Sequence, residues 1–209
     1  MSAPRFILYS HDGCGLGHLR RNLAIAAAVT EKAPDASVVL LTGCIELGAQ
    51  GLAPNVEIVS LPALRKLGNG QYGARRLPIT RNELRLVRAA LISAAVEWFR
   101  PDVLLIDKHP MGVRGELCPA LASLPEWGGR AVLGLRDILD DPATVREEWG
   151  REGVIEFTEA HCDRLLVYGN PSVFDLVGEY GLPASLARRA RYCGYVVHPD
   201  AARRLTVAS

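Results

Sequence analysis

The chain has 209 residues with 24 basic and 23 acidic side chains, so its formal net charge is +1. Hydrophobic residues make up 49% of the sequence, which supplies a sizeable core and excludes disorder for most of the chain. The near-zero charge argues against a dedicated nucleic-acid-binding protein, which normally carries a strong basic excess. The five cysteines are an odd number without C-x-x-C spacing, which favours a cytoplasmic protein over a disulfide-stabilised or zinc-binding one.

Short apolar runs alternate with segments of helical periodicity along the chain. The pattern begins with a strand at 5–10, a Gly-rich loop, a helix at 19–32 and strands at 37–42 and 56–60. An aperiodic segment at 61–77, expected to be a functional or mobile loop, precedes a helix at 80–99, a strand at 103–107 and a helix at 113–124. A strand at 131–135, a helix at 142–157, a strand at 164–168, a helix at 171–180 and a strand at 191–195 complete it.

These strands are apolar at nearly every position, as expected when helices cover both faces of a parallel sheet. We therefore predict an α/β fold: one Rossmann-like domain with a doubly wound, mostly parallel sheet of about seven strands. The domain is predicted to span residues 1–198, and residues 199–209 are predicted to start a linker or tail.

Ligands of open parallel sheets bind at the carboxyl ends of the strands, which directs attention to the loop after the first strand, HDGCGLGHLRR. Gly13, Gly15 and Gly17 let the backbone turn tightly and approach a ligand. The helix that follows offers free N–H groups to a phosphate or another anion. The alternative is a plain strand-to-helix turn. A dinucleotide fingerprint does not fit, because His18 holds the place of its last glycine, and no Gly-Lys-Ser/Thr makes a P-loop.

His18 stands at the start of this helix and is a candidate general base, since histidine titrates near physiological pH. Its alternative is a capping or packed histidine. Arg20 and Arg21 are candidates for holding a phosphate or carboxylate, although at least one is expected on a solvated helix face. Asp12 is either a turn former or a ligand contact.

The segment YSHDGCGLGHLRRNLAIA, with G-x-G-H-x-x-R after the first strand, resembles the N-terminal half of GT-B glycosyltransferases. It is similar to predicted bacterial members related to the peptidoglycan-precursor N-acetylglucosaminyltransferase and to the UDP-sugar hydrolase of the pseudaminic acid pathway. The resemblance implies an acceptor-binding domain, a second domain for the nucleotide-sugar donor, and catalysis without a metal or cofactor. It also implies that His18 deprotonates the acceptor hydroxyl and that an Asp at a later strand end steadies it.

Asp107, the last residue of VLLID, is the candidate for that Asp. A carboxylate beside the imidazole would fix its tautomer, whereas the alternative role is to cap the following loop. His109 could take the place of Asp107 or simply lie on the loop. After the fifth strand, Arg136 could bind an anionic group and Asp137 a sugar hydroxyl, or the two could form an ion pair with each other or with a helix end.

The segment at 61–77 carries four basic residues, Arg65, Lys66, Arg75 and Arg76. In membrane-associated relatives a basic and apolar surface of the N-terminal domain docks on anionic lipid, so this segment is a candidate for peripheral contact with the inner membrane face. The alternative is a solvated mobile loop.

The sequence thus predicts the acceptor-binding N-terminal domain of an inverting, metal-independent glycosyltransferase that moves a sugar from a nucleotide sugar to an acceptor hydroxyl. A length of 209 residues suits half of such an enzyme, so the chain alone is expected to be inactive. The loop from Asp12 to Gly17 differs from the Gly-Gly-Thr-Gly-Gly type of the peptidoglycan enzyme, which predicts a different acceptor. The alternatives are a nucleotide-sugar hydrolase of the same architecture and a non-catalytic subunit of a split two-chain glycosyltransferase.

Overall fold

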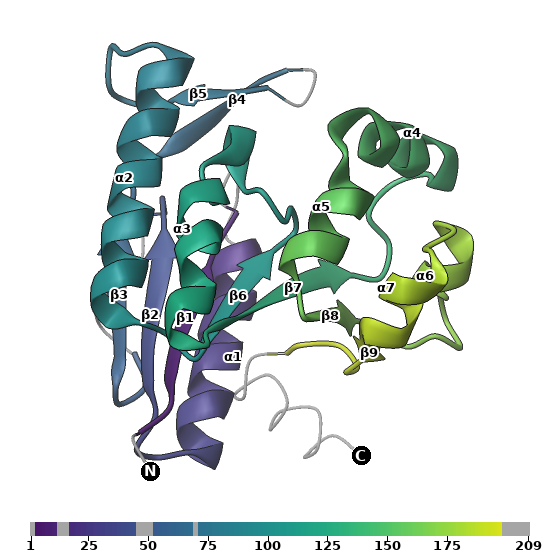
Figure 1. Ribbon diagram of the computed structural model, residues 1–209, viewed down its shortest axis with the longest axis horizontal. Helices are drawn as coiled ribbons and strands as arrows, with labels where there is room; N and C mark the ends of the chain where they lie inside the picture. The colour runs from purple at the N-terminus through teal and green to yellow at the C-terminus, as the bar shows by residue number, and fades with distance from the viewer. Residues whose placement is uncertain (1–2, 12–16, 45–51, 69–70, 198–209) are drawn as a thin grey trace, which may run out of the picture.

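A seven-stranded parallel sheet lies at the centre of the computed structural model, which describes residues 3–11, 17–44, 52–68 and 71–197 (Figure 1). The strands are β1 (Arg5–Tyr9), β2 (Ser37–Thr42), β3 (Val56–Ser60), β6 (Val103–Asp107), β7 (Arg130–Arg136), β8 (Arg164–Tyr168) and β9 (Ala190–Tyr192). Their order across the sheet is β3-β2-β1-β6-β7-β8-β9, and all neighbours are parallel. The predicted doubly wound α/β fold is confirmed.

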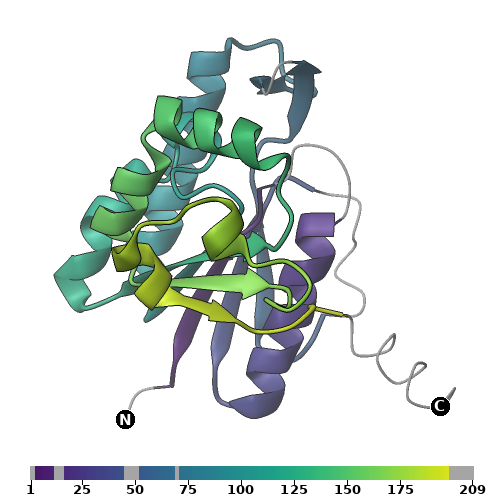
Figure 2. The same ribbon diagram turned by 90° about the vertical axis from the view of Figure 1, so that its right-hand side faces the viewer.

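Helices lie on both faces of this sheet (Figures 1 and 2). Helix α1 (Gly17–Lys32) covers one face, and α2 (Arg81–Phe99), α3 (Cys118–Ser123) and α5 (Val154–His161) cover the other. The remaining helical segments are α4 (Pro142–Glu152), α6 (Leu176–Glu179), α7 (Ala184–Arg189) and the 3-10 turns η1 (Val113–Gly115) and η2 (Leu124–Trp127).

Alternate residues of each central strand enter different hydrophobic clusters, which explains why the strands are apolar throughout. In β1, Leu8 packs with Leu19 of α1, whereas Ile7 belongs to the larger cluster with Ile92 and Val96 of α2. All five side chains are almost completely buried. The core therefore holds α1 and α2 against opposite faces of the same strand.

The segment at 61–77 is a β-hairpin, which corrects the prediction of an aperiodic loop. Strands β4 (Leu64–Gly68) and β5 (Gln71–Ala74) pair antiparallel, beside the N-terminal part of α2 (Figure 1). Leu64 is buried with Leu84 and Val113, and Tyr72 packs against them, while residues 65–68 are exposed. Because only a few positions on one face are apolar, the run shows little hydrophobic alternation, and its basic composition conceals the strands.

Three predicted helices have different bounds in the structure. The helix expected at 142–157 is divided into α4 and α5 by Gly153, whose φ of 63° is left-handed and ends α4. The helix expected at 113–124 is the turn η1 followed by α3, and the one expected at 171–180 shortens to α6. Helix α7 was not predicted. In the three predicted runs a local turn interrupts a segment that has helical composition.

An ion pair is buried beneath β1. The Arg88 side chain, 1% exposed, donates from Nε and a terminal nitrogen to the two carboxylate oxygens of Glu116, each at 2.7 Å. Its other terminal nitrogen donates to the Pro62 carbonyl at 2.7 Å, and the Tyr9 hydroxyl donates to Glu116 at 2.6 Å. Burial, followed by the Glu116 charge, raises the pKa of Tyr9, so the phenol keeps the proton that it donates. The network ties α2, β1 and the segment before α3 together.

Replacing Arg88 with methionine should destabilise the domain by roughly 3–5 kcal/mol, because the Glu116 carboxylate would be left buried without its cation. Denaturant unfolding of the variant measures the loss. Arg85→Met, at a partly exposed position of α2 without a buried ion pair, is the matched control and should change stability by less than about 0.5 kcal/mol. Equal losses in the two variants would contradict a special role for the buried pair.

Candidate active site

The sheet changes winding direction between β1 and β6. The chain runs from β1 outward to β2 and β3, then returns to place β6 on the other side of β1. Tyr9 of β1 pairs with Ile106 of β6, so the residues that follow both strands meet at one edge. Such a switch point is where open α/β sheets bind ligands.

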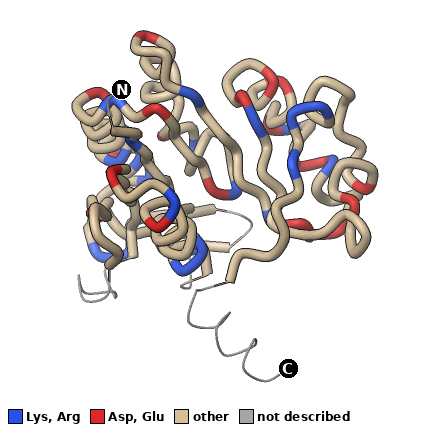
Figure 3. The backbone as a smooth tube through the Cα atoms, turned by 90° about the horizontal axis from the view of Figure 1, so that it is seen from below, with Lys and Arg blue, Asp and Glu red and all other residues tan. Residues whose placement is uncertain are grey.

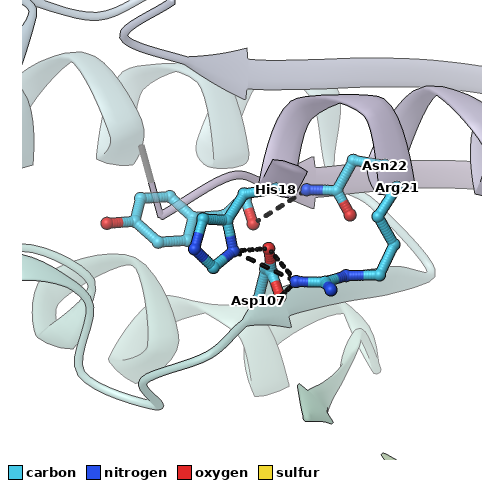
Figure 4. Close-up of polar contacts among 5 residues, drawn as sticks. His18, Arg21, Asn22 and Asp107 are labelled. Carbon is cyan, nitrogen blue, oxygen red and sulfur yellow. Dashed lines mark hydrogen bonds and ion pairs between the residues drawn. The ribbon is translucent and has the colours of Figure 1, made fainter. Parts of the chain in front are cut away.

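His18 and Asp107 meet at this point (Figure 4). His18 is the second residue of α1, Asp107 is the last residue of β6, and His18 Nδ1 lies 2.6 Å from Asp107 Oδ2. The Asp107 side chain is 1% exposed and that of His18 is 26% exposed. A buried carboxylate thus faces an imidazole that remains open to a ligand.

Arg21 also binds this carboxylate. A terminal guanidinium nitrogen donates to Asp107 Oδ1 at 2.7 Å and to Oδ2 at 3.0 Å, and it lies 3.1 Å from His18 Nδ1. His18 and Arg21 are three residues apart on α1 and therefore share a helix face. Asn22 secures the helix, because its Nδ2 donates to the Tyr9 carbonyl of β1 at 3.4 Å. Sequence reasoning proposed Arg21 only as one of two anion-binding arginines.

The contacts favour one tautomer of the imidazole. An ionised carboxylate only accepts hydrogen bonds, so the contact of 2.6 Å with Asp107 favours the tautomer that carries its proton on His18 Nδ1. The lone pair then lies on Nε2, which is the arrangement of a general base. The carboxylate would also stabilise the imidazolium formed when Nε2 accepts a proton.

His11, two residues after β1, is a site residue that sequence reasoning missed. It is 5% exposed, and its Nδ1 is buried without a hydrogen-bond partner. Its ring lies edge-to-face with Tyr72 of the hairpin, with centroids 5.5 Å apart, and 6.2 Å from the His18 ring. Burial, followed by the charge of Lys108, holds the pKa of His11 well below its ordinary value. The only sequence signal was its position next to the Gly-rich loop.

Positive charge gathers at this edge of the sheet. The pKa of Lys108, the residue after Asp107, is lowered mainly by partial desolvation and then by the nearby charges of Arg136 and Lys66, against the opposing carboxylates of Asp107 and Glu148. These cations come from the loop after β6, the end of β7 and the hairpin strand β4. Elsewhere along the described chain basic and acidic residues are interspersed (Figure 3). The local excess of cations favours a ligand with an anionic group.

The two candidates at the end of β7, Arg136 and Asp137, have different hydrogen-bond partners among the described residues. Arg136 is exposed and donates to the Leu139 carbonyl at 2.7 Å. Asp137 is 9% exposed and accepts from the Ile138 N–H at 2.9 Å and the Tyr195 hydroxyl at 2.9 Å. The carboxylate is thus used to hold the loop and the segment after β9, while the Arg136 side chain stays at the surface.

The structure places His109 beside α4. Its Nε2 lies 2.9 Å from the Glu152 carboxylate, and its Nδ1 is buried without a partner. Burial lowers its pKa, against the opposing effect of Glu152. Asp107, not His109, is therefore the residue that contacts His18.

Of the remaining residues predicted to contact a ligand, some lie within the described part of the chain and others do not. Arg20 is exposed on α1, and Gly17 begins that helix. Asp12, Gly13 and Gly15 lie outside the described residues. Among the described residues no group of three or more His, Cys, Asp or Glu side chains is arranged to hold a metal ion.

No protein-family model matches the chain, and no curated protein matches its sequence. Solved structures do match. UGT2 of Phytolacca americana, complexed with UDP-2fluoro-glucose and pterostilbene, has a TM-score of 0.56 at 13% identity over 99% of this chain and 57% of that one. A glycosyltransferase from Rickettsia africae has a TM-score of 0.57 at 7% identity, over 100% and 50%. MurG of Acinetobacter baumannii has a TM-score of 0.51 at 11% identity, over 96% and 47%.

The chain spans about half the length of these proteins. At such low identities the likeness establishes the fold. The chain therefore has the Rossmann-like fold of one half of a GT-B glycosyltransferase, as the resemblance of its first loop predicted.

The buried His11 should make stability depend on pH. Its pKa is lower in the folded protein than the value near 6.5 of the unfolded chain, so the unfolded state takes up the proton first as the pH falls. The free energy of unfolding is therefore highest above the pKa of the unfolded chain. Below that pH it falls by at most ~1.4 kcal/mol per pH unit for this residue. Denaturant unfolding between pH 8 and pH 5 measures the slope.

His109, whose pKa is also lowered, adds to the same slope. His11→Gln should flatten it partly, whereas His161→Gln on α5 is the control and should keep it. An unchanged slope in His11→Gln would show that His11 protonates equally in both states.

Proposed function

We propose that this chain is the acceptor-binding half of an inverting glycosyltransferase in which His18 is the general base. The observation that carries the proposal is the contact of 2.6 Å between His18 Nδ1 and the buried Asp107 carboxylate, at the switch point of the sheet. A histidine with its tautomer fixed by a carboxylate, and its other nitrogen open to the ligand edge, is suited to remove a proton from a hydroxyl group.

The proposed reaction is a single displacement. His18 Nε2 takes the proton of the acceptor hydroxyl while the acceptor oxygen bonds to the anomeric carbon of the donor sugar. The bond from that carbon to the nucleotide diphosphate breaks on the opposite side, so the anomeric configuration inverts. Asp107 balances the positive charge that develops on the imidazole. We also propose that the reaction needs no metal ion. The resemblance of the first loop is what supports this part of the proposal.

The donor in this proposal is a uridine-diphosphate sugar, held by a second half that faces this domain. UGT2 of Phytolacca americana contains such a donor analogue, and this chain spans about half of that protein. The cations of Lys108, Arg136 and Lys66 at the same edge support binding of a substrate that carries phosphate or carboxylate.

Replacing His18 with alanine should reduce sugar transfer by about 10²–10⁴-fold if it is the general base. The assay uses the natural protein with any chain that co-purifies, labelled UDP-glucose or UDP-N-acetylglucosamine, and a lipid and glycan extract of the source cells as acceptor. Transfer is measured with and without EDTA.

His161→Ala, on α5, is the matched control and should transfer at the native rate. Native transfer by His18→Ala would remove His18 from the mechanism. Release of free sugar by the native protein without an acceptor would identify a nucleotide-sugar hydrolase instead.

We also propose peripheral contact with an anionic membrane surface through the hairpin β4–β5. Leu67 and Leu77 are 48% and 50% exposed, Arg65 and Lys66 are exposed just before Leu67, and Arg75 and Arg76 are exposed just before Leu77. Helix α2, whose N-terminal part packs beside the hairpin, carries further exposed apolar side chains, among them Leu86 and Val87. No helix of the described residues has the length and apolarity needed to span a bilayer. The described cysteines are free thiols, which supports the cytoplasmic face.

Reversing two hairpin charges, in Arg65→Glu/Lys66→Glu, should weaken binding to vesicles that contain phosphatidylglycerol by at least about tenfold, because each basic residue near such a surface contributes ~1 kcal/mol. Co-sedimentation measures binding, with phosphatidylcholine vesicles as the uncharged reference. Arg164→Glu/Arg188→Glu has the same charge change on exposed residues of β8 and α7 and should bind as the native protein does. Equal weakening in both variants would show that net charge alone matters.

A further inference from the structure

The side chain of Arg21 is mostly buried and makes several polar contacts at the candidate active site. Its side chain is 16% exposed, and one terminal nitrogen reaches both Asp107 oxygens and lies 3.1 Å from His18 Nδ1. Figure 4 shows its guanidinium beside the Asp107 carboxylate, with the same terminal nitrogen linked to the carboxylate and to the imidazole. A single cation thus holds the carboxylate that orients the base.

The other side of the guanidinium meets an aromatic ring. The central carbon of Arg21 lies 5.0 Å from the centroid of the Tyr168 ring, within the range of a cation–π interaction. Arg21 Nε is buried without a hydrogen-bond partner, and the Tyr168 ring provides a favourable contact for the guanidinium. Tyr168 is the last residue of β8, two strands from β6.

Tyr168 is itself locked in place. It is 4% exposed, and a Cβ at Gly134 of β7 would collide with its hydroxyl oxygen, so the absence of a side chain there makes room for the ring. The hydroxyl is buried without a partner. Burial, followed by the Asp107 charge, raises its pKa, which keeps the phenol neutral. The structure therefore uses the ring of Tyr168 and not its hydroxyl.

We infer that Arg21 and Tyr168 are positioning residues for the base: the Tyr168 ring holds the Arg21 guanidinium, which holds the Asp107 carboxylate, which orients His18. This inference rests on the proposed function, in which His18 Nε2 accepts the acceptor proton. Neither residue has to touch the substrate. Their effect is to fix the direction of the carboxylate that orients the imidazole and to offset part of its negative charge.

Removal of Arg21 should change the protonation of His18 in one direction. Without this cation the Asp107 charge acts on His18 undiminished, and protonated His18 becomes easier to form. The His18 titration midpoint should then rise by about one pH unit, the order expected for a charge within 4–6 Å. A base that is protonated at higher pH loses activity at the acid end of its range.

The direct test is NMR titration of the His18 imidazole in this chain, which needs no substrate. Arg21→Met should raise the midpoint by about one pH unit and weaken the downfield Nδ1–H signal of an imidazole bound to a carboxylate. Tyr168→Leu should shift it in the same direction but less, and Tyr168→Phe should keep the native value because the ring remains. Arg20→Met, the exposed neighbour on α1, is the charge-matched control and should also keep it.

In the transfer assay, Arg21→Met should lower kcat by about 10²-fold, as misplacement of a catalytic group does, with little change in KM. Its acid limb should move to higher pH, and Arg21→Lys should recover part of kcat. A native His18 midpoint in Arg21→Met, or an equal shift in Arg20→Met, would overturn the inference. If the native protein transfers no sugar, the proposed function fails, and the titration still decides whether Arg21 and Tyr168 organise His18.

Discussion

A carboxylate cannot be buried in a protein interior unless a cation or several donors compensate its charge, and Asp107 is almost completely buried at the end of β6. Helix α1 meets this requirement, because His18 and Arg21 lie one turn apart and reach the same carboxylate. The need to neutralise one charge therefore sets the position of the helix start on the sheet. The same contacts that make the burial of Asp107 tolerable also determine the tautomer of the histidine.

The surrounding elements hold that position from two directions. Asn22 ties α1 to the end of β1 on one face, and the Tyr9 hydroxyl ties β1 to the buried pair of Arg88 and Glu116 on the other. Both partners of the His18–Asp107 pair thus belong to regular elements with packed surroundings. A site on such elements is held more accurately than one built on loops, and general-base catalysis depends on that accuracy.

The sequence was sufficient to predict the sheet and the contact between His18 and Asp107. It was insufficient to predict the hairpin and the residues that position this pair. Seven apolar runs predicted seven parallel strands, because covered strands are apolar at nearly every position. The resemblance of the first loop implied an Asp at a later strand end, and Asp107 was the candidate in that place. The hairpin was missed because its outward residues are basic and its apolar face is short. Arg21 and Tyr168 are 147 residues apart in the chain, and nothing local in either segment indicates that the two side chains stack. Contacts of this kind depend on the order of strands across the sheet, which a single sequence does not specify.

The residues at this edge of the sheet fall into two groups that differ in how well they tolerate substitution. In the His18–Asp107–Arg21 group a buried carboxylate is shared by two partners, so a change in any member removes a contact that compensates or uses this charge. The hairpin, Lys108 and Arg136 lie at the surface around it, where substitutions cost little stability. His11 joins the two, since its ring contacts Tyr72 of the hairpin and lies next to His18. Under the proposed function, a change of acceptor would therefore arise in the hairpin and the adjoining loops, while the base and the residues that position it remain the same.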